Sequence, residues 1–268
     1  MNMSLQGPGP FRRPAVVTGG HPRTHHRNAA LAVLSPRAFS ILEPHLRQRD
    51  FAEGSVLWDA GAPTERVYFP SSGIISVVLP IKDGCGIEVA TVGREGAAGL
   101  GHGSGQLRAV TQGITLISGT FSYMSAVQFA NAVRQSEEIE RLAATLHDWL
   151  LTQSQQLAAC NAVHSADARF CRWLLQSGER LEGDVVPSTQ ETIAQALGIR
   201  RTTVTLIAQG LQMDGIISYR RGKILIRNRE ALRAAACDCC AALGRRNWPS
   251  ERLARSADGP VDPQGSAG

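Results

Sequence analysis

The feature that most limits the possible folds of this chain is a helix-like run that stops at a glycine and then resumes. Residues 188–215 read STQETIAQALGIRRTTVTLIAQGLQMDG. Ser188 or Thr189 can cap a first helix, because a hydroxyl there accepts a hydrogen bond from an N–H that the first turn leaves unpaired. Gly198 ends it, since glycine adopts the left-handed conformation at a helix end without strain. A second helix follows, and its apolar face consists of Val204, Ile207, Ala208 and Leu211.

The segments on either side complete a recognisable order of elements. Residues 165–176 begin with a capping serine and have helical spacing, and residues 216–228, IISYRRGKILIRN, read as strand, turn and strand. Arg221, Gly222 and Lys223 stand at the tip of that hairpin. A helix, a helix-turn-helix and a β-hairpin in this order predict a winged helix-turn-helix domain.

The second helix of such a motif begins with basic and hydroxyl side chains. In a helix-turn-helix this helix enters the major groove, and its N-terminal residues meet the base edges. Arginine there bonds guanine O6 and N7, threonine bonds phosphate or touches a thymine methyl, and a first-helix N-terminus suits a phosphate. The alternative is a helical hairpin whose Arg-Arg pair is only a solvated face. The candidate DNA-binding residues are Ser188, Thr189, Gln190, Arg200, Arg201, Thr202, Thr203, Thr205, Arg220, Arg221 and Lys223.

The N-terminal half carries the pattern of a small β domain. Residues 55–61, 66–80, 86–93 and 113–125 are rich in Val, Ile, Thr and aromatic residues, with turn residues between them. The stretch KDGCG at 82–86 predicts a hairpin turn, and residues 125–135 turn helical. Short strands at regular spacing indicate a barrel or roll. The predicted fold class is therefore α+β, with a β-roll before the winged helix-turn-helix.

Residues 137–162 have the spacing of a long helix between these two parts. The apolar positions recur at alternating steps of three and four, as in a coiled coil, and Ser136 can cap the helix. We predict a dimerisation helix, and the alternative is a helix that packs on its own domain. The predicted seam consists of Ile139, Leu142, Leu146, Trp149, Gln153 and Leu157.

Composition and charge bound the remaining segments. Apolar residues make up 43% of the 268 residues and the net charge is +5, which fits a soluble protein with an anionic partner. No apolar run nears the roughly 18–20 residues that span a bilayer, and the N-terminus lacks a signal, so we expect the cytoplasm and no membrane. The predicted division is 1–27 disordered tail, 28–135 β-roll sensor-like domain, 136–163 dimerisation helix, 164–240 winged helix-turn-helix and 241–268 disordered tail.

Over residues 34–235 the sequence resembles a Crp/Fnr-type transcriptional regulator. The stretch TQETIAQALGIRRTTVTLIAQGLQMDGIISYRRGKILI is similar to the family's helix-turn-helix and wing, and FAEGSVLWDAGAPTERVYFPSSGIISV resembles the opening strands of its cyclic-nucleotide-binding-like roll. The resemblance implies a homodimer on a palindromic site in double-stranded DNA. It also implies RNA polymerase as a further partner where the protein activates. No catalytic motif stands out, so an enzyme is not expected.

Departures from the family pattern sharpen this expectation. Arg201 matches the family's first recognition arginine, but Thr202 stands where many members carry Glu and Leu206 where they carry a second Arg, which predicts a different half-site. In the roll, Gly99 matches the phosphate-cassette glycine, but Leu100 replaces the Glu that holds the ribose. The candidate ligand loop is Glu95, Gly99, Leu100 and Arg108, and we expect an effector other than cyclic AMP. A cyclic-nucleotide-responsive regulator is the alternative.

The six cysteines leave one further alternative. The family's iron–sulfur members group cysteines near the N-terminus, and residues 1–84 contain none. Cys160 and Cys171 have core or seam spacing, and the cluster CDCC at 237–240 lacks a second ligand pair at metal-finger spacing. Nothing singles out His102, His147 or His164 as a haem ligand. We therefore expect no metal or cofactor, and a thiol- or metal-responsive sensor that uses residues 237–240 remains an alternative.

Overall fold

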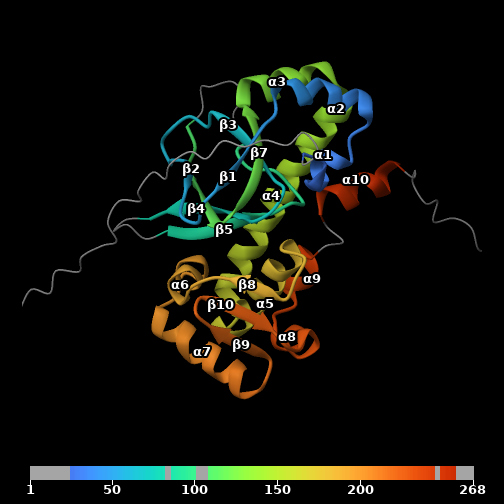
Figure 1. Cartoon of the computed structure of the whole chain (residues 1–268). Helices are drawn as coiled ribbons and strands as arrows, with labels where there is room; N and C mark the ends of the chain where they lie inside the picture. The colour runs from blue at the N-terminus through green and yellow to red at the C-terminus, as the bar shows by residue number, and fades with distance from the viewer. Residues whose placement is uncertain (1–24, 82–85, 101–107, 245–247, 258–268) are drawn as a thin grey trace, which may run out of the picture.

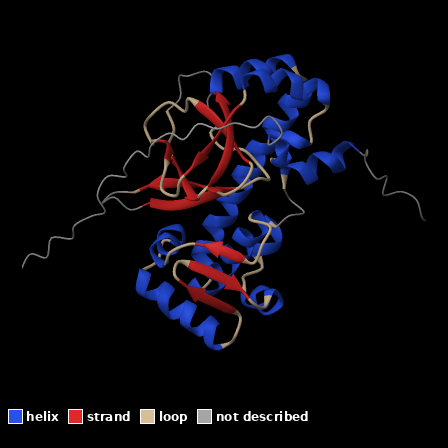
Figure 2. Cartoon of the chain, viewed as in Figure 1, coloured by secondary structure: helices blue, strands red, loops and turns tan. Residues whose placement is uncertain are grey.

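A computed structural model describes residues 25–81, 86–100, 108–244 and 248–257, with a β-rich body above, a smaller mixed body below and a long helix through both (Figure 1). Figure 2 shows that the strands form two groups, one in each body. Residues 82–85 of the predicted hairpin turn and all but the last three residues of the predicted N-terminal tail lie outside the described residues, and Gly86 begins β5.

The elements of the upper body are η1 (His25–Arg27), α1 (Ala29–Ala32), α2 (Pro36–Leu42), η2 (Glu43–His45), β1 (Arg47–Phe51), β2 (Val56–Trp58), β3 (Arg66–Pro70), β4 (Ile74–Pro80), β5 (Gly86–Val92), β6 (Gln112–Ile117), β7 (Gly119–Ser125) and α3 (Ala126–Gln135). Two antiparallel sheets, in the orders β1-β7-β3 and β2-β6-β4-β5, build the roll. This agrees with the predicted α+β class.

A glycine corner explains why two runs that read as single strands are each divided. The stretch 66–80 breaks at Gly73 and the stretch 113–125 breaks before Gly119, and each run passes from one sheet to the other there. Gly73 has φ +75°, and a Cβ on Gly119 would lie 2.2 Å from the carbonyl oxygen of Ser72. Only glycine fits such a close backbone approach, so the two breaks form one corner of the roll.

The remaining elements along the chain are α4 (Glu137–Val163), α5 (Ala166–Arg180), β8 (Val185–Pro187), α6 (Gln190–Leu197), α7 (Arg201–Met213), β9 (Ile217–Arg220), β10 (Lys223–Ile226), α8 (Arg229–Ala235), α9 (Cys239–Leu243) and α10 (Pro249–Ala257), and α5 to α9 build the lower body. Strands β8, β10 and β9 form a small antiparallel sheet. Helix α4 begins at Ser136, whose hydroxyl accepts from the Ile139 N–H at 3.4 Å.

The predicted dimer seam on α4 is buried inside the protomer itself. Ile139, Leu142 and Leu146 are fully buried in the cluster that holds α1, α2 and α3, and Trp149 packs in the roll's aromatic cluster. Gln153 and Leu157 are buried further along the same face. The assignment of these side chains to a dimer contact was wrong, because α4 runs beside the roll and buries its stripe there. The spacing of the apolar residues on α4 is the same whether the helix packs against the roll or against a second chain.

The C-terminal segment is also more ordered than its polar composition predicts. The predicted disordered tail at 241–268 is wrong for residues 248–257, where α10 lies against α4 and α1 (Figure 1). Trp248 is buried, Leu253 packs against the α1–α4 cluster, and Arg252 donates to Asp148 at 2.5 Å. A few apolar anchors in a polar segment are sufficient to dock it, and average composition hides them.

Candidate nucleic-acid interface

Helices α6 and α7 pack across the predicted turn. The Thr189 hydroxyl caps α6 by accepting from the Thr192 N–H at 3.1 Å, and Gly198 ends α6 with φ +62°. The side chains of Ile193 and Val204 are fully buried in the cluster between the helices. These contacts fix the angle between the helices and thereby the direction of α7.

The first turn of α7 presents its predicted side chains to solvent. Arg200, Arg201 and Thr202 are exposed at this end, and Thr203 is half-buried. Thr205 is engaged within the protein, because its hydroxyl donates to the Gln190 side-chain oxygen at 2.9 Å. The exposed arginines are therefore the groups of this helix that can reach base edges.

The wing places more positive charge beside this surface. Arg221 and Gly222 form the hairpin turn with φ +50° and +72°, and Arg220, Arg221 and Lys223 are exposed. Burial raises the pKa of the half-buried Tyr219 phenol on β9, and the Arg201 guanidinium opposes that shift. Helix α7 also packs against β9, so the wing lies beside this helix.

Ser188 is the member of the predicted set that the structure removes from the surface. Its side chain is 2% exposed, its N–H donates to the Gly222 carbonyl at 2.9 Å, and its carbonyl accepts from the Tyr219 hydroxyl at 3.0 Å. The prediction that Ser188 contacts phosphate was wrong. The residue anchors the wing tip to the N-terminus of α6.

The predicted ligand loop does not gather into a site. Leu100 is buried in the α1–α4 cluster, and Arg108 donates to the Gly61 carbonyl at 2.7 Å on the exposed surface. A Cβ on Gly99 would lie 2.3 Å from the Arg66 carbonyl oxygen, so this glycine serves a close chain crossing. These residues therefore contact different parts of the protein and do not line one site.

Glu95 faces the lower body. Its carboxylate accepts from the Arg180 Nε at 2.7 Å and from the Gly93 N–H at 3.0 Å. Both side chains of the ion pair are almost fully buried. The glutamate thus ties the roll to α5, the first helix of the lower body.

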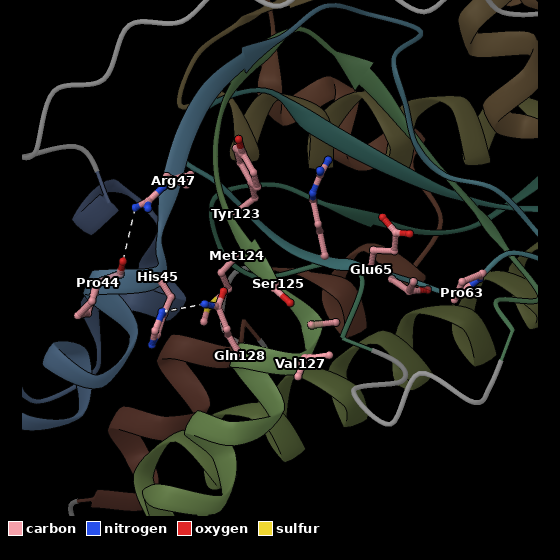
Figure 3. Close-up of a pocket in the computed structure, with 13 residues that line it drawn as sticks. Pro44, His45, Arg47, Pro63, Glu65, Tyr123, Met124, Ser125, Val127 and Gln128 are labelled. Atoms are coloured by element: carbon pink, nitrogen blue, oxygen red, sulfur yellow. Dashed lines mark hydrogen bonds between the residues drawn. The ribbon is translucent and has the colours of Figure 1, made fainter.

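A surface pocket of about 520 Å³ opens elsewhere on the roll, between η2, β3, β7 and α3. In Figure 3, His45 and Gln128 meet across it at 3.0 Å, and Arg47, Glu65 and Tyr123 stand around it. None of the four predicted ligand residues lines this pocket.

A cluster of sulfur and nitrogen donors lies where α4 meets the lower body. The ligand atoms of Cys160, His164, Cys237 and Cys239 all lie within 4.8 Å of one another. Sequence reasoning placed Cys160 in the core and noticed 237–240 alone. The missed signal was the spacing of Cys160 and His164, which lie one helical turn apart at the end of α4, where His164 is the C-cap.

Comparisons with known proteins agree with this geometry. Residues 168–235 match the Crp-like helix-turn-helix domain. This segment is a Crp-like helix-turn-helix domain. It covers α5 to α8, and so contains both the α6–α7 motif and the wing.

Solved structures extend the likeness from the Crp-like domain to the whole fold. FixK2 from Bradyrhizobium japonicum is 17% identical with a TM-score of 0.64, covering 72% of this chain and 98% of that one. A CRP/FNR-family transcriptional regulator from Thermus thermophilus is 21% identical with a TM-score of 0.59, covering 71% and 98%. The c-di-GMP-responsive global regulator CLP of Xanthomonas campestris is 15% identical with a TM-score of 0.60, covering 72% and 99%.

These structures show that the chain has the Crp/Fnr-type fold: a β-roll, a long helix and a winged helix-turn-helix. No curated protein sequence matches the chain. Within the described residues, no helix has the length and apolar character to cross a bilayer.

Proposed function

We propose that this protein is a sequence-specific transcriptional regulator that binds palindromic double-stranded DNA as a homodimer. The observation that carries the proposal is the exposure of Arg200 and Arg201 on α7 and of Arg220, Arg221 and Lys223 on the wing, whose strand β9 packs against α7. Wing cations position a domain on phosphates, and the recognition helix reads bases. The proposal places the protein in the cytoplasm and gives it no catalytic role.

The exposed side chains of α7 define the sequence that it reads. Arg201 suits a guanine, whereas Thr202 cannot act as the charged acceptor that pairs with cytosine N4. Leu206 is 68% exposed and so offers an apolar contact suited to a thymine methyl. We infer a half-site that differs from the common family half-site of TGTGA type.

A dimer contact fits the opposite face of α4 from the one the spacing first indicated. Exposed Ala144, Leu151, Ala158 and Ala162 recur at heptad-compatible positions, and the side chain of Leu151 is 56% exposed. Small residues let two helices approach closely, with Leu151 as the larger apolar contact. Two protomers joined along this face would set two α7 helices about one DNA turn, roughly 34 Å, apart.

The effector in this proposal is not cyclic AMP. The residues that stand in the place of the family's phosphate cassette are used elsewhere, with Glu95 in an ion pair and Leu100 in the core. RNA polymerase is the further partner that activation requires.

The test compares DNA binding by wild type, Arg201→Ala and a control, Arg233→Ala, which removes an exposed arginine on α8. Fluorescence anisotropy on a selected palindrome and on random DNA measures both affinities. Arg201→Ala should weaken binding to the selected site by about 1–3 kcal/mol and relax one base position, with Arg233→Ala close to wild type. Equal losses for Arg201→Ala on both DNAs would overturn the assignment of α7 as the reading helix.

A further inference from the structure

The cluster at the end of α4 has the composition of a closed metal site. Three cysteine sulfurs and one imidazole nitrogen, from Cys160, His164, Cys237 and Cys239, face one another. Thiolate and imidazole donors together are the set that zinc prefers, in tetrahedral sites with four protein ligands. All three cysteines are buried, as is usual for a structural site.

The distances between donors agree with that coordination. Cys160 Sγ lies 3.5 Å from Cys237 Sγ, and Cys239 Sγ lies 3.6 Å from His164 Nδ1. Metal–sulfur bonds of about 2.3 Å and metal–nitrogen bonds of about 2.0 Å give tetrahedral edges of about 3.8 Å between sulfurs and about 3.5 Å between sulfur and nitrogen. The four donors therefore need only small shifts to surround one ion.

Two separate backbone segments hold the donors in place. Cys160 and His164 are one turn apart, and the His164 N–H donates to the Cys160 carbonyl at 3.1 Å. Cys237 precedes α9 and its N–H donates to the Ala168 carbonyl in α5 at 3.4 Å, while the Cys240 N–H closes the turn onto Cys237. The site joins chain positions 77 residues apart.

The surroundings supply a hydrogen bond of the kind that a thiolate ligand accepts. The Gln156 side-chain N–H donates to Cys239 Sγ at 2.9 Å, the kind of outer contact that orients a ligand. A bound cation would stabilise the thiolates of these buried cysteines.

We propose that Cys160, His164, Cys237 and Cys239 bind one divalent zinc-class ion that fastens the α9 segment to the elbow between α4 and α5. Zn²⁺ binding releases three thiol protons to solvent and leaves no open coordination position. Residues His164 and Ser165 alone separate α4 from α5, so the ion would stiffen the link through which the DNA-binding domain is attached. This consequence for DNA binding rests on the proposed function, whereas the metal site does not.

The direct test is metal content of the full-length protein, purified under reducing conditions and loaded with Zn²⁺. We expect one zinc per chain, and Co²⁺ substitution should give the visible absorption of tetrahedral cobalt thiolate. Cys237→Ser and His164→Ala should lose the ion to a competing chelator. The matched control Cys240→Ser changes a neighbouring cysteine that is not a proposed ligand, and this variant should retain the zinc ion. No bound metal, equal zinc loss in the control, a Cys160–Cys237 disulfide in reduced protein, or an iron–sulfur chromophore would each overturn the proposal.

Thermal unfolding distinguishes loss of the metal site from misfolding of a variant. Zinc should raise the Tm of wild type and of Cys240→Ser, since a ligand that binds only the native state stabilises that state. It should leave the Tm of His164→Ala unchanged. This variant is expected to fold, because His164 is only half-buried. Equal zinc-induced shifts in all three would contradict the site. If zinc binds as predicted and no DNA sequence is selected, the metal site stands and the proposed function fails.

Discussion

Glu95 of the roll and Arg180 of α5 form a buried ion pair at 2.7 Å that joins the two bodies of the protein. Arg180 also donates to the Thr91 carbonyl at 3.3 Å and to the Gln153 side chain of α4 at 3.4 Å. One guanidinium thus contacts the roll and the long helix while belonging to the helix-turn-helix domain. The pair fixes how that domain sits against the roll in this conformation.

Arg180→Met should destabilise the protein by about 3–5 kcal/mol, because it leaves the Glu95 carboxylate buried without its cation. The double variant Glu95→Gln/Arg180→Met should recover part of that loss, since neither charge remains. Urea unfolding measures both. Arg94→Met is the control, because its pair with Glu182 is far more exposed, at 22% and 57%, and should contribute about 1 kcal/mol or less. If Arg180→Met matched the control, the buried pair would not hold the bodies together.

Glu88 should make stability depend on pH. Burial raises its pKa to about 7, against the opposing hydrogen bond from Ser76 at 2.6 Å and the charge of Arg172. The folded state keeps a proton that the unfolded chain releases above pH about 4.5, so the free energy of unfolding falls as pH rises from about 4.5 to 7. The loss is on the order of 3 kcal/mol.

Glu88→Gln should remove this contribution, and Glu137→Gln, at the exposed start of α4, should retain it. Urea titrations across that pH window compare the two. An equally steep decline in Glu88→Gln would show that another group is responsible.

The two faces of α4 should respond differently to substitution. Leu151→Glu alters an exposed face and should yield folded monomers by light scattering, because a charge at a helix seam opposes pairing. Leu146→Ala removes a fully buried side chain and should cost about 2–5 kcal/mol of stability. A Leu151→Glu protein that keeps the dimer mass would refute the proposed interface.

Much of this architecture could be predicted from the sequence, because capping residues and glycine turns act locally. The sequence predicts the caps at Ser136 and Thr189 and the helix end at Gly198, and the structure confirms all three. The partner of a buried face was not, since the stripe through Leu146 fits a second chain or the roll equally well. The Cys160–Cys237 contact joins residues on either side of the helix-turn-helix domain, so no local pattern could reveal it.

Lys223 on the wing should contribute affinity without specificity. Lys223→Ala should weaken binding to all sequences alike and lower the slope of log K against log salt by about one, because it removes one phosphate contact. Anisotropy titrations at several salt concentrations measure this slope. A loss restricted to the selected site would place Lys223 among the base-reading residues instead.

Selection of bound DNA by the purified protein, run with and without cyclic AMP, tests the central claim most directly. The account predicts one palindrome whose half-sites lie a DNA turn apart, differ from the common family half-site, and are recovered equally in both conditions. Recovery of no enriched sequence in either condition would contradict the assignment as a sequence-specific regulator. Enrichment only with the nucleotide would contradict the inference that the roll does not respond to cyclic AMP.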